Sequence, residues 1–192
     1  MVVMVAALMI GGMAGWATGG NPARLASIRI YAWPLLAAAV VLESFLGSTP
    51  AQYRTLLAVT ACLSVAAWCA LNGARGGQPR FGQASISLGV GLNATVMAVN
   101  SGMPVSASAL AEAGLSKTLD VARGHLYKHA PMGVHTRLRY LGDIIPVRLV
   151  RTVLSPGDLL ILVGIVAVTW AATQHSPTRP VRLANLASRT LH

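Results

Sequence analysis

Apolar residues dominate this chain in five blocks of similar length, which short polar segments separate. Each block is about 17 residues long and almost free of charge, close to the lower limit for a helix that crosses a hydrocarbon layer of about 30 Å. The pattern predicts an all-α integral membrane bundle of about five transmembrane helices. The blocks are residues 2–18, 31–47, 56–72, 84–100 and 158–173.

A longer segment of mixed polarity, residues 101–157, separates the fourth block from the fifth. Ser106 or Ser108 suits the N-cap of a short helix over residues 107–113, and Gly114 would end it. Leucines on one side favour a helix that lies at the membrane surface. We therefore expect a single membrane domain, residues 1–173, with a structured loop, followed by a polar basic tail over residues 174–192.

The composition agrees with a membrane protein. Only 10% of the residues are charged, whereas soluble domains carry about 25%. The net charge of +10 comes from cations beside the apolar blocks, where they contact lipid head groups and set orientation. No basic stripe with interleaved aromatic residues is present, so nucleic acid is not an expected partner. The Ala-, Gly- and Arg-rich composition is typical of a GC-rich bacterium and places the chain in its inner membrane.

The charges of the short loops predict the orientation. The segments after the first and third blocks lie on one side with the tail, and together they hold seven arginines, against Arg54 alone after the second block. The positive-inside rule then predicts an external N-terminus and a cytoplasmic C-terminus. Residues 101–157 carry seven further cations on the opposite side. The length of this segment is near the limit of about 60 residues above which loop charge no longer determines the orientation of the helices. The seven arginines are Arg24, Arg29, Arg75, Arg80, Arg179, Arg182 and Arg189.

Small residues form a ridge on the first predicted helix. Gly11, Gly15 and Gly19 recur every four residues, and such a row lets another helix backbone approach closely. The ridge predicts packing against a neighbouring helix of the same chain. The alternative is a contact with a membrane-protein partner or with a second copy of the chain.

A few polar residues interrupt the apolar blocks. Apart from Asp158, which begins the fifth block, Glu43 is the one acid inside a block. A carboxylate in a bilayer is expensive and suggests function, but Glu43 also lies four residues from the end of its block, where head groups begin. Asn93 and Asn100 share a face of the fourth helix, which must therefore point into the bundle or a wet cavity. Hydrogen bonding between helices and the lining of a ligand site are both open for this face.

The segment before the last helix contains the remaining candidate residues. His125 and His129 are four apart and could share a metal with His135 or Asp143, although the signal is weak and we expect no metal or other cofactor. Ser155 and Asp158 have the spacing of a capping box at the start of the last helix. We expect these last two residues to be structural.

Three motifs resemble those of a family of small bacterial membrane proteins that is defined only as a domain of unknown function. They are Asn-Ser-Gly-Met-Pro-Val at residues 100–105, Leu-Gly-Asp-Ile-Ile-Pro at 141–146 and Ser-Pro-Gly-Asp at 155–158. The resemblance extends over most of the chain and is best from about Asn93 to Asp158. The chain departs from the family pattern at Arg148 and Arg151 and in its basic tail. Because the family has no established activity, the resemblance implies an architecture and no reaction.

The sequence favours a non-enzymatic membrane protein, since it lacks a nucleophile elbow, a phosphate loop and a dinucleotide fingerprint. We expect an accessory protein or a module that binds lipid or a small ligand, with a polar site between the fourth helix and residues 101–157. One alternative is an enzyme for a quinone or isoprenoid, with His125, His129, Asp143 and Glu43 as its polar groups. Another is a transporter or channel subunit with Glu43 on a wet path. The expected site consists of Asn93, Asn100, Met103, Pro104, Arg137 and Asp143.

Overall fold

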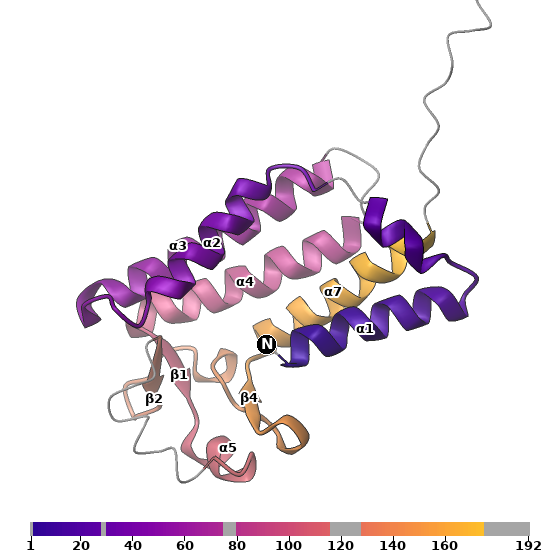
Figure 1. Cartoon of the computed structure of the whole chain (residues 1–192). Helices are drawn as coiled ribbons and strands as arrows, with labels where there is room; N and C mark the ends of the chain where they lie inside the picture. The colour runs from indigo at the N-terminus through magenta and orange to yellow at the C-terminus, as the bar shows by residue number, and fades with distance from the viewer. Residues whose placement is uncertain (1, 28–29, 75–79, 116–127, 175–192) are drawn as a thin grey trace, which may run out of the picture.

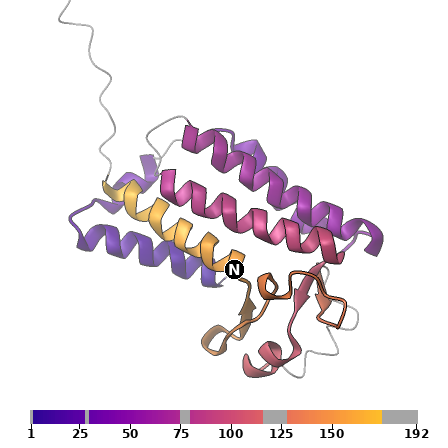
Figure 2. The same cartoon turned by 180° about the vertical axis from the view of Figure 1, so that it is seen from behind.

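Five long helices lie side by side in a single layer. The computed structural model describes residues 2–27, 30–74, 80–115 and 128–174. The helices contact one another in the order α2, α3, α4, α7, α1, so the first and last helices are neighbours and α4 is central; in Figure 1, α2 lies in front of α3. Figure 2 shows the same layer from behind. The helices are α1 (Val2–Ala17), α2 (Trp33–Phe45), α3 (Ala51–Ala74), α4 (Arg80–Asn100) and α7 (Pro156–Gln174).

Proline and glycine mark several helix ends. Pro34 lies in the first turn of α2 and Pro156 begins α7, positions where the missing N–H costs no helical hydrogen bond. After α1 the chain turns at Gly19, whose φ of 86° favours glycine. It then forms the short 3-10 helix η1 (Pro22–Ser27), from which Arg24 donates hydrogen bonds to the last carbonyl groups of α7.

Glycines bring α4 and α7 into close contact. Gly82 and Gly89 on α4 face Gly164 and Gly157 on α7. A Cβ atom on Gly164 would lie 2.7 Å from the carbonyl oxygen of Gly82, and one on Gly89 would meet the carbonyl oxygen of Gly157. Between these glycines, Ser85 donates a hydrogen bond of 2.7 Å to the Leu160 carbonyl. Small residues at this spacing let two backbones meet in membrane helices.

The glycine ridge of α1 packs against α7 in the same way. A Cβ atom on Gly11 would lie 2.7 Å from the carbonyl oxygen of Val166, and one on Gly15 would collide with the Thr173 hydroxyl. Gly19 has open space around its Cβ position. Gly11 and Gly15 therefore serve a contact inside the chain.

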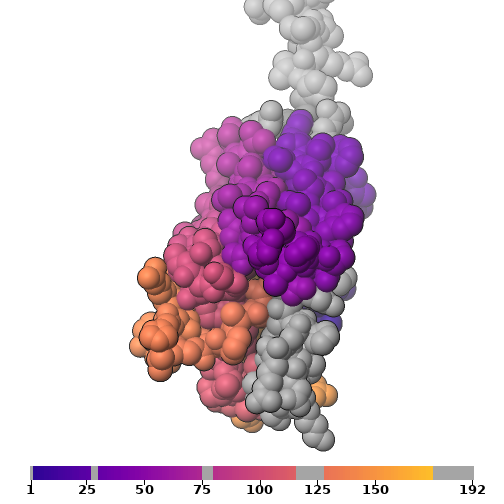
Figure 3. Space-filling view, turned by 90° about the vertical axis from the view of Figure 1, so that its left-hand side faces the viewer, coloured from indigo at the N-terminus to yellow at the C-terminus, as the bar shows by residue number. Residues whose placement is uncertain are grey.

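A small mixed unit, here called the cap (described residues 103–115 and 128–154), covers one end of the layer. It lies where α1 begins and α4 ends (Figure 1), and Figure 3 shows it in orange and pink below the purple ends of α2 and α3. Strand β1 (Met103–Val105) pairs in parallel with β2 (His129–Pro131), and β3 (Ile145–Val147) pairs antiparallel with β4 (Thr152–Leu154). Helix α5 (Ala107–Glu112) and the 3-10 turns η3 (Arg139–Leu141) and η4 (Arg148–Val150) complete the cap.

The fold agrees with the sequence in its helices and differs in two respects. The molecule is mostly helical, but the four short strands of the cap were not predicted. Of the described helices, α3 and α7 are long and apolar enough to cross a membrane, whereas α1 and α2 are shorter apolar helices of 16 and 13 residues. At 1.5 Å per residue these two measure about 24 and 20 Å, less than a hydrocarbon layer of about 30 Å.

Candidate functional site

A cavity of about 300 Å³ lies where the cap meets the helix layer. Its wall combines residues from α1, α3, α4, the cap and the first turns of α7. The volume is at the lower end of the range for ligand pockets, about 300–1,000 Å³. The lining residues are Val3, Met4, Cys62, Asn93, Met97, Met103, Lys128, His129, Asp143, Thr152, Val153, Leu154, Asp158, Ile161 and Leu162.

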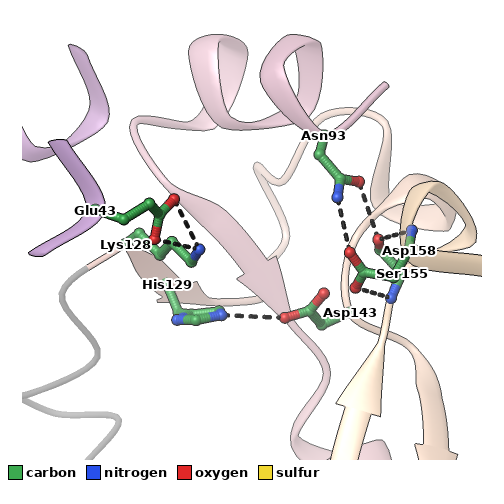
Figure 4. A network of polar contacts seen from close by, with 7 residues as sticks. All are labelled: Glu43, Asn93, Lys128, His129, Asp143, Ser155 and Asp158. Carbon is green, nitrogen blue, oxygen red and sulfur yellow. Dashed lines mark hydrogen bonds and ion pairs between the residues drawn. The ribbon is translucent and has the colours of Figure 1, made fainter. Parts of the chain in front are cut away.

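Asn93 joins α4 to the first turn of α7. Its amide nitrogen donates to Asp158 Oδ1 at 2.9 Å, and its amide oxygen accepts from Ser155 Oγ at 2.9 Å (Figure 4). Ser155 and Asp158 also exchange hydrogen bonds, because the Asp158 N–H donates to Ser155 Oγ and the Ser155 N–H donates to Asp158 Oδ2. That reciprocal pair is a capping box. The three side chains thus form one closed polar network at the cavity wall.

Asp143 presents a buried carboxylate to the same cavity. The residue is only 5% exposed, and its Oδ2 lies 3.4 Å from His129 Nε2 (Figure 4). Its backbone is fixed between β1 and α5, since its N–H donates to the Pro104 carbonyl and its carbonyl accepts from the Ser106 N–H. Burial raises the pKa of the Asp143 carboxyl above its ordinary value, and the hydrogen bond from His129 opposes the rise. A carboxylate held in this way is poised to accept a hydrogen bond or a positive charge from a ligand.

An ion pair ties the end of α2 to the cap beside the cavity. Lys128 Nζ lies 2.9 Å from Glu43 Oε2 and 3.1 Å from Oε1 (Figure 4). Both side chains are more than a third exposed. Glu43 is therefore placed at the level of the cap rather than deep between the helices.

Asn100 binds to the cap, unlike Asn93, which binds to the start of α7. Its side chain accepts from the Arg137 N–H at 2.8 Å and donates to the Arg137 carbonyl at 2.9 Å. These two hydrogen bonds position the loop before η3. Arg137 itself is exposed, and neither it nor Asn100 lines the cavity.

Three of the six residues of the expected ligand site line the cavity. Asn93, Met103 and Asp143 share its wall, whereas Pro104 is fully buried behind it. Sequence reasoning placed Asp158 in a helix cap only. It gave Lys128, Met97 and Thr152 no role. Nothing in the spacing along the chain indicates that these residues face one space, because they lie on elements that meet only in the fold.

The histidines do not form a metal centre within the described residues. His125 lies outside them, His129 lines the cavity beside Asp143, and His135 is exposed elsewhere on the cap. Within the described ranges no three His, Cys, Asp or Glu side chains are grouped as metal ligands. The cavity offers instead two carboxylates, an imidazole, an ammonium group and an amide, set beside methionine, leucine and valine side chains. Such a mixture suits a ligand with a polar end and an apolar end.

Comparison with known proteins agrees with the resemblance in the motifs. No curated protein and no solved structure matches the chain. The model of one family, described as a family of unknown function, matches residues 25–170, which include α2, α3, α4, the cap and most of α7. The chain is a member of this family, DUF5317.

Proposed function

We propose that this chain is a five-helix membrane protein that binds a small ligand in the cavity between the helix layer and the cap. Large apolar side chains cover the layer and support its placement in a bilayer. They include Met9 and Met13 on α1, Val40 on α2, Leu63 on α3 and Leu88 on α4, all about half exposed or more. A soluble protein rarely exposes continuous apolar surface of this extent.

All five helices cross the membrane in this proposal, although α1 and α2 are short. A helix shorter than the hydrocarbon layer is accommodated by local thinning of the bilayer and by interfacial residues at its ends. Trp16 lies in the last turn of α1 and Trp33 begins α2, and both indole groups are exposed, as in the aromatic belts at membrane interfaces. The charges of the short loops favour a cytoplasmic end at Arg24 and Arg80 and an external cap.

The observation that carries the binding proposal is the buried carboxylate of Asp143 in a cavity at the end of a membrane layer. Burying an ionisable group is costly, and the His129 contact of 3.4 Å is a loose one, so the carboxylate can also accept a hydrogen bond from a ligand in the cavity. The polar network of Asn93, Ser155 and Asp158 holds together the part of the wall that α4 and α7 contribute. A preformed wall with a few placed polar groups among apolar side chains is the usual arrangement of a ligand pocket.

The pair of His129 and Asp143 supports a second candidate, an enzyme that acts on a lipid-soluble substrate. A carboxylate that orients an imidazole is the arrangement of a general base. The distance of 3.4 Å is loose, as such pairs often are without substrate. Turnover of a quinone or isoprenoid that ends with the His129→Gln variant would favour this candidate.

The test of the binding proposal is native mass spectrometry of the full chain released from nanodiscs. We expect one small molecule on the wild-type chain and loss of it in Asp143→Asn and in Thr152→Trp, which narrows the cavity. Removing a hydrogen bond to a charged group costs about 1.5–3 kcal/mol, so Asp143→Asn should lower occupancy about tenfold or more. Leu149→Trp is the matched control, because Leu149 is a cap residue that is 94% exposed. Equal amounts of bulk lipid on all four proteins would refute the proposal.

A further inference from the structure

A second hollow adjoins the cavity and follows the helices. It is a groove of about 570 Å³ between α1 and α7, and every residue that lines it is apolar. Val3, Leu154 and Leu162 line both the cavity and the groove. The two spaces therefore adjoin across these three side chains, with the polar cavity at the cap and the apolar groove along α1 and α7. A ligand that occupies both spaces must pass between these side chains.

The shape of the groove matches one hydrocarbon chain. On α1 it extends from Val3 to Ala14, which corresponds to about 16 Å of helix. Ala6 and Ala7 on α1 and Ala167 on α7 leave room along it because their side chains are small. Larger apolar side chains such as Ile10 form the side wall of the groove.

The polar end of this composite space is rich in hydrogen-bond acceptors. Asp143 and Asp158 contribute carboxylates to the cavity. Asp158 adds its negative charge, but both of its oxygens already accept hydrogen bonds from Asn93 and Ser155, so Asp143 is the acceptor for a ligand. Lys128 lies there as well, but its ammonium group already pairs with Glu43. The balance of charge favours a head group with an ammonium or hydroxyl donor and disfavours a phosphate, which two carboxylates would repel.

We infer that the ligand is a single-chain amphiphile whose donor-bearing head contacts Asp143 in the cavity and whose hydrocarbon tail lies in the groove between α1 and α7. This inference rests on the proposed binding function and specifies its ligand class. The tail enters the groove from the surrounding bilayer and lies along α1. The head stays at the depth of the cap, where it contacts Asp143. A polar cavity with an apolar extension of this kind discriminates against ligands that lack either end.

The experiment uses photolabelling of the full chain in phosphatidylcholine nanodiscs. The probe is an alkylamine with a diazirine near the middle of its chain, and the matched probe is the fatty acid of the same length with the same diazirine. We expect the amine to label groove residues of α1 and α7, such as Ile10 and Val163, and excess alkylamine without the diazirine to compete. The carboxylate probe should label these positions about tenfold less, as expected when a charged hydrogen bond is replaced by repulsion.

Two variants separate the groove from the cavity. Ala6→Trp fills the groove at an exposed position of α1, and Ala38→Trp places the same side chain at an exposed position of α2 away from it. We expect Ala6→Trp and Asp143→Asn to reduce groove labelling severalfold and Ala38→Trp to leave it unchanged. Competition in the wild-type chain gives the same information if a variant folds poorly.

Each contrary result has a distinct meaning. Labels confined to cap residues such as Met103 and Thr152 would overturn the inference and leave the binding function in place. Uniform labelling of the exposed faces of α2 and α3, without competition, would overturn both. Equal groove labelling by amine and carboxylate would overturn the assignment of the head group.

Discussion

Asn93 and Asp158 lie 65 positions apart in sequence and share a hydrogen bond of 2.9 Å that joins α4 to the start of α7. The bond fixes the point at which the cap returns to the helix layer. Asp158 also caps its own helix through the Ser155 N–H, so one carboxylate serves the local and the tertiary structure together. Loss of this network should therefore loosen the wall of the cavity.

Replacing Asn93 should therefore destabilise the protein. Asn93→Ala leaves Asp158 Oδ1 and the buried Ser155 hydroxyl without their partner, and an unsatisfied buried polar group costs about 1–3 kcal/mol. Thermal unfolding in a mild detergent, followed by circular dichroism, measures the change. Thr95→Val on the same helix is the control, because Thr95 is exposed and bonds only to its own helix at Gly91. Equal stability of the two variants would show that the network contributes nothing.

A methyl group added to α4 should destabilise the protein at a glycine that contacts α7 and stabilise it at a glycine outside this contact. Gly89→Ala places a Cβ atom against the carbonyl oxygen of Gly157, and forcing such atoms apart costs about 1–3 kcal/mol. Gly91→Ala on the same helix meets nothing within 4 Å and should gain up to about 1 kcal/mol from helix propensity. The two unfolding temperatures should thus move in opposite directions. A shift of both in the same direction would contradict the packing described here.

The described part of the chain illustrates what sequence can and cannot predict. Apolar blocks and helix-capping residues predicted α1, α2, α3, α4 and α7, because the helix period and the cost of charge in an apolar layer act locally. The strands of the cap are three residues long and pair across separated segments, so no period could reveal them. Asp143 was expected in one site with Arg137, yet it lies beside His129, because β2 carries His129 to β1 and Asp143 itself bridges to Val105 of β1.

Asp143 should make stability depend on pH. Burial raises its pKa in the folded chain, so the folded state binds more protons than the unfolded state above the ordinary aspartate value of about 3.9. Stability should then fall as pH rises from that value through the raised pKa and level off above it. The Asp143→Asn variant lacks this ionisation. Its stability relative to the wild-type chain should increase with pH over that window in thermal unfolding series, and a constant difference would contradict the cause given.

Glu43 should matter little for stability. Its ion pair with Lys128 is partly exposed, and such pairs are worth about 0–1 kcal/mol. Glu43→Gln should lower the free energy of unfolding by less than about 1 kcal/mol. It also frees the Lys128 ammonium group at the cavity wall, so ligand occupancy should fall by less than in Asp143→Asn. A loss of ligand as large as in Asp143→Asn would instead place Glu43 within the binding site.

The central claim is that the cavity beside Asp143 holds a small molecule. The most direct measurement is a cryo-electron microscopy map of the full chain in lipid nanodiscs, with a rigid antibody fragment bound for size. We predict non-protein density in contact with Asp143, continuous towards Val3 and Leu162, and its absence from a map of the Thr152→Trp variant. A cavity closed by repacked side chains, or filled by water alone, would contradict the claim.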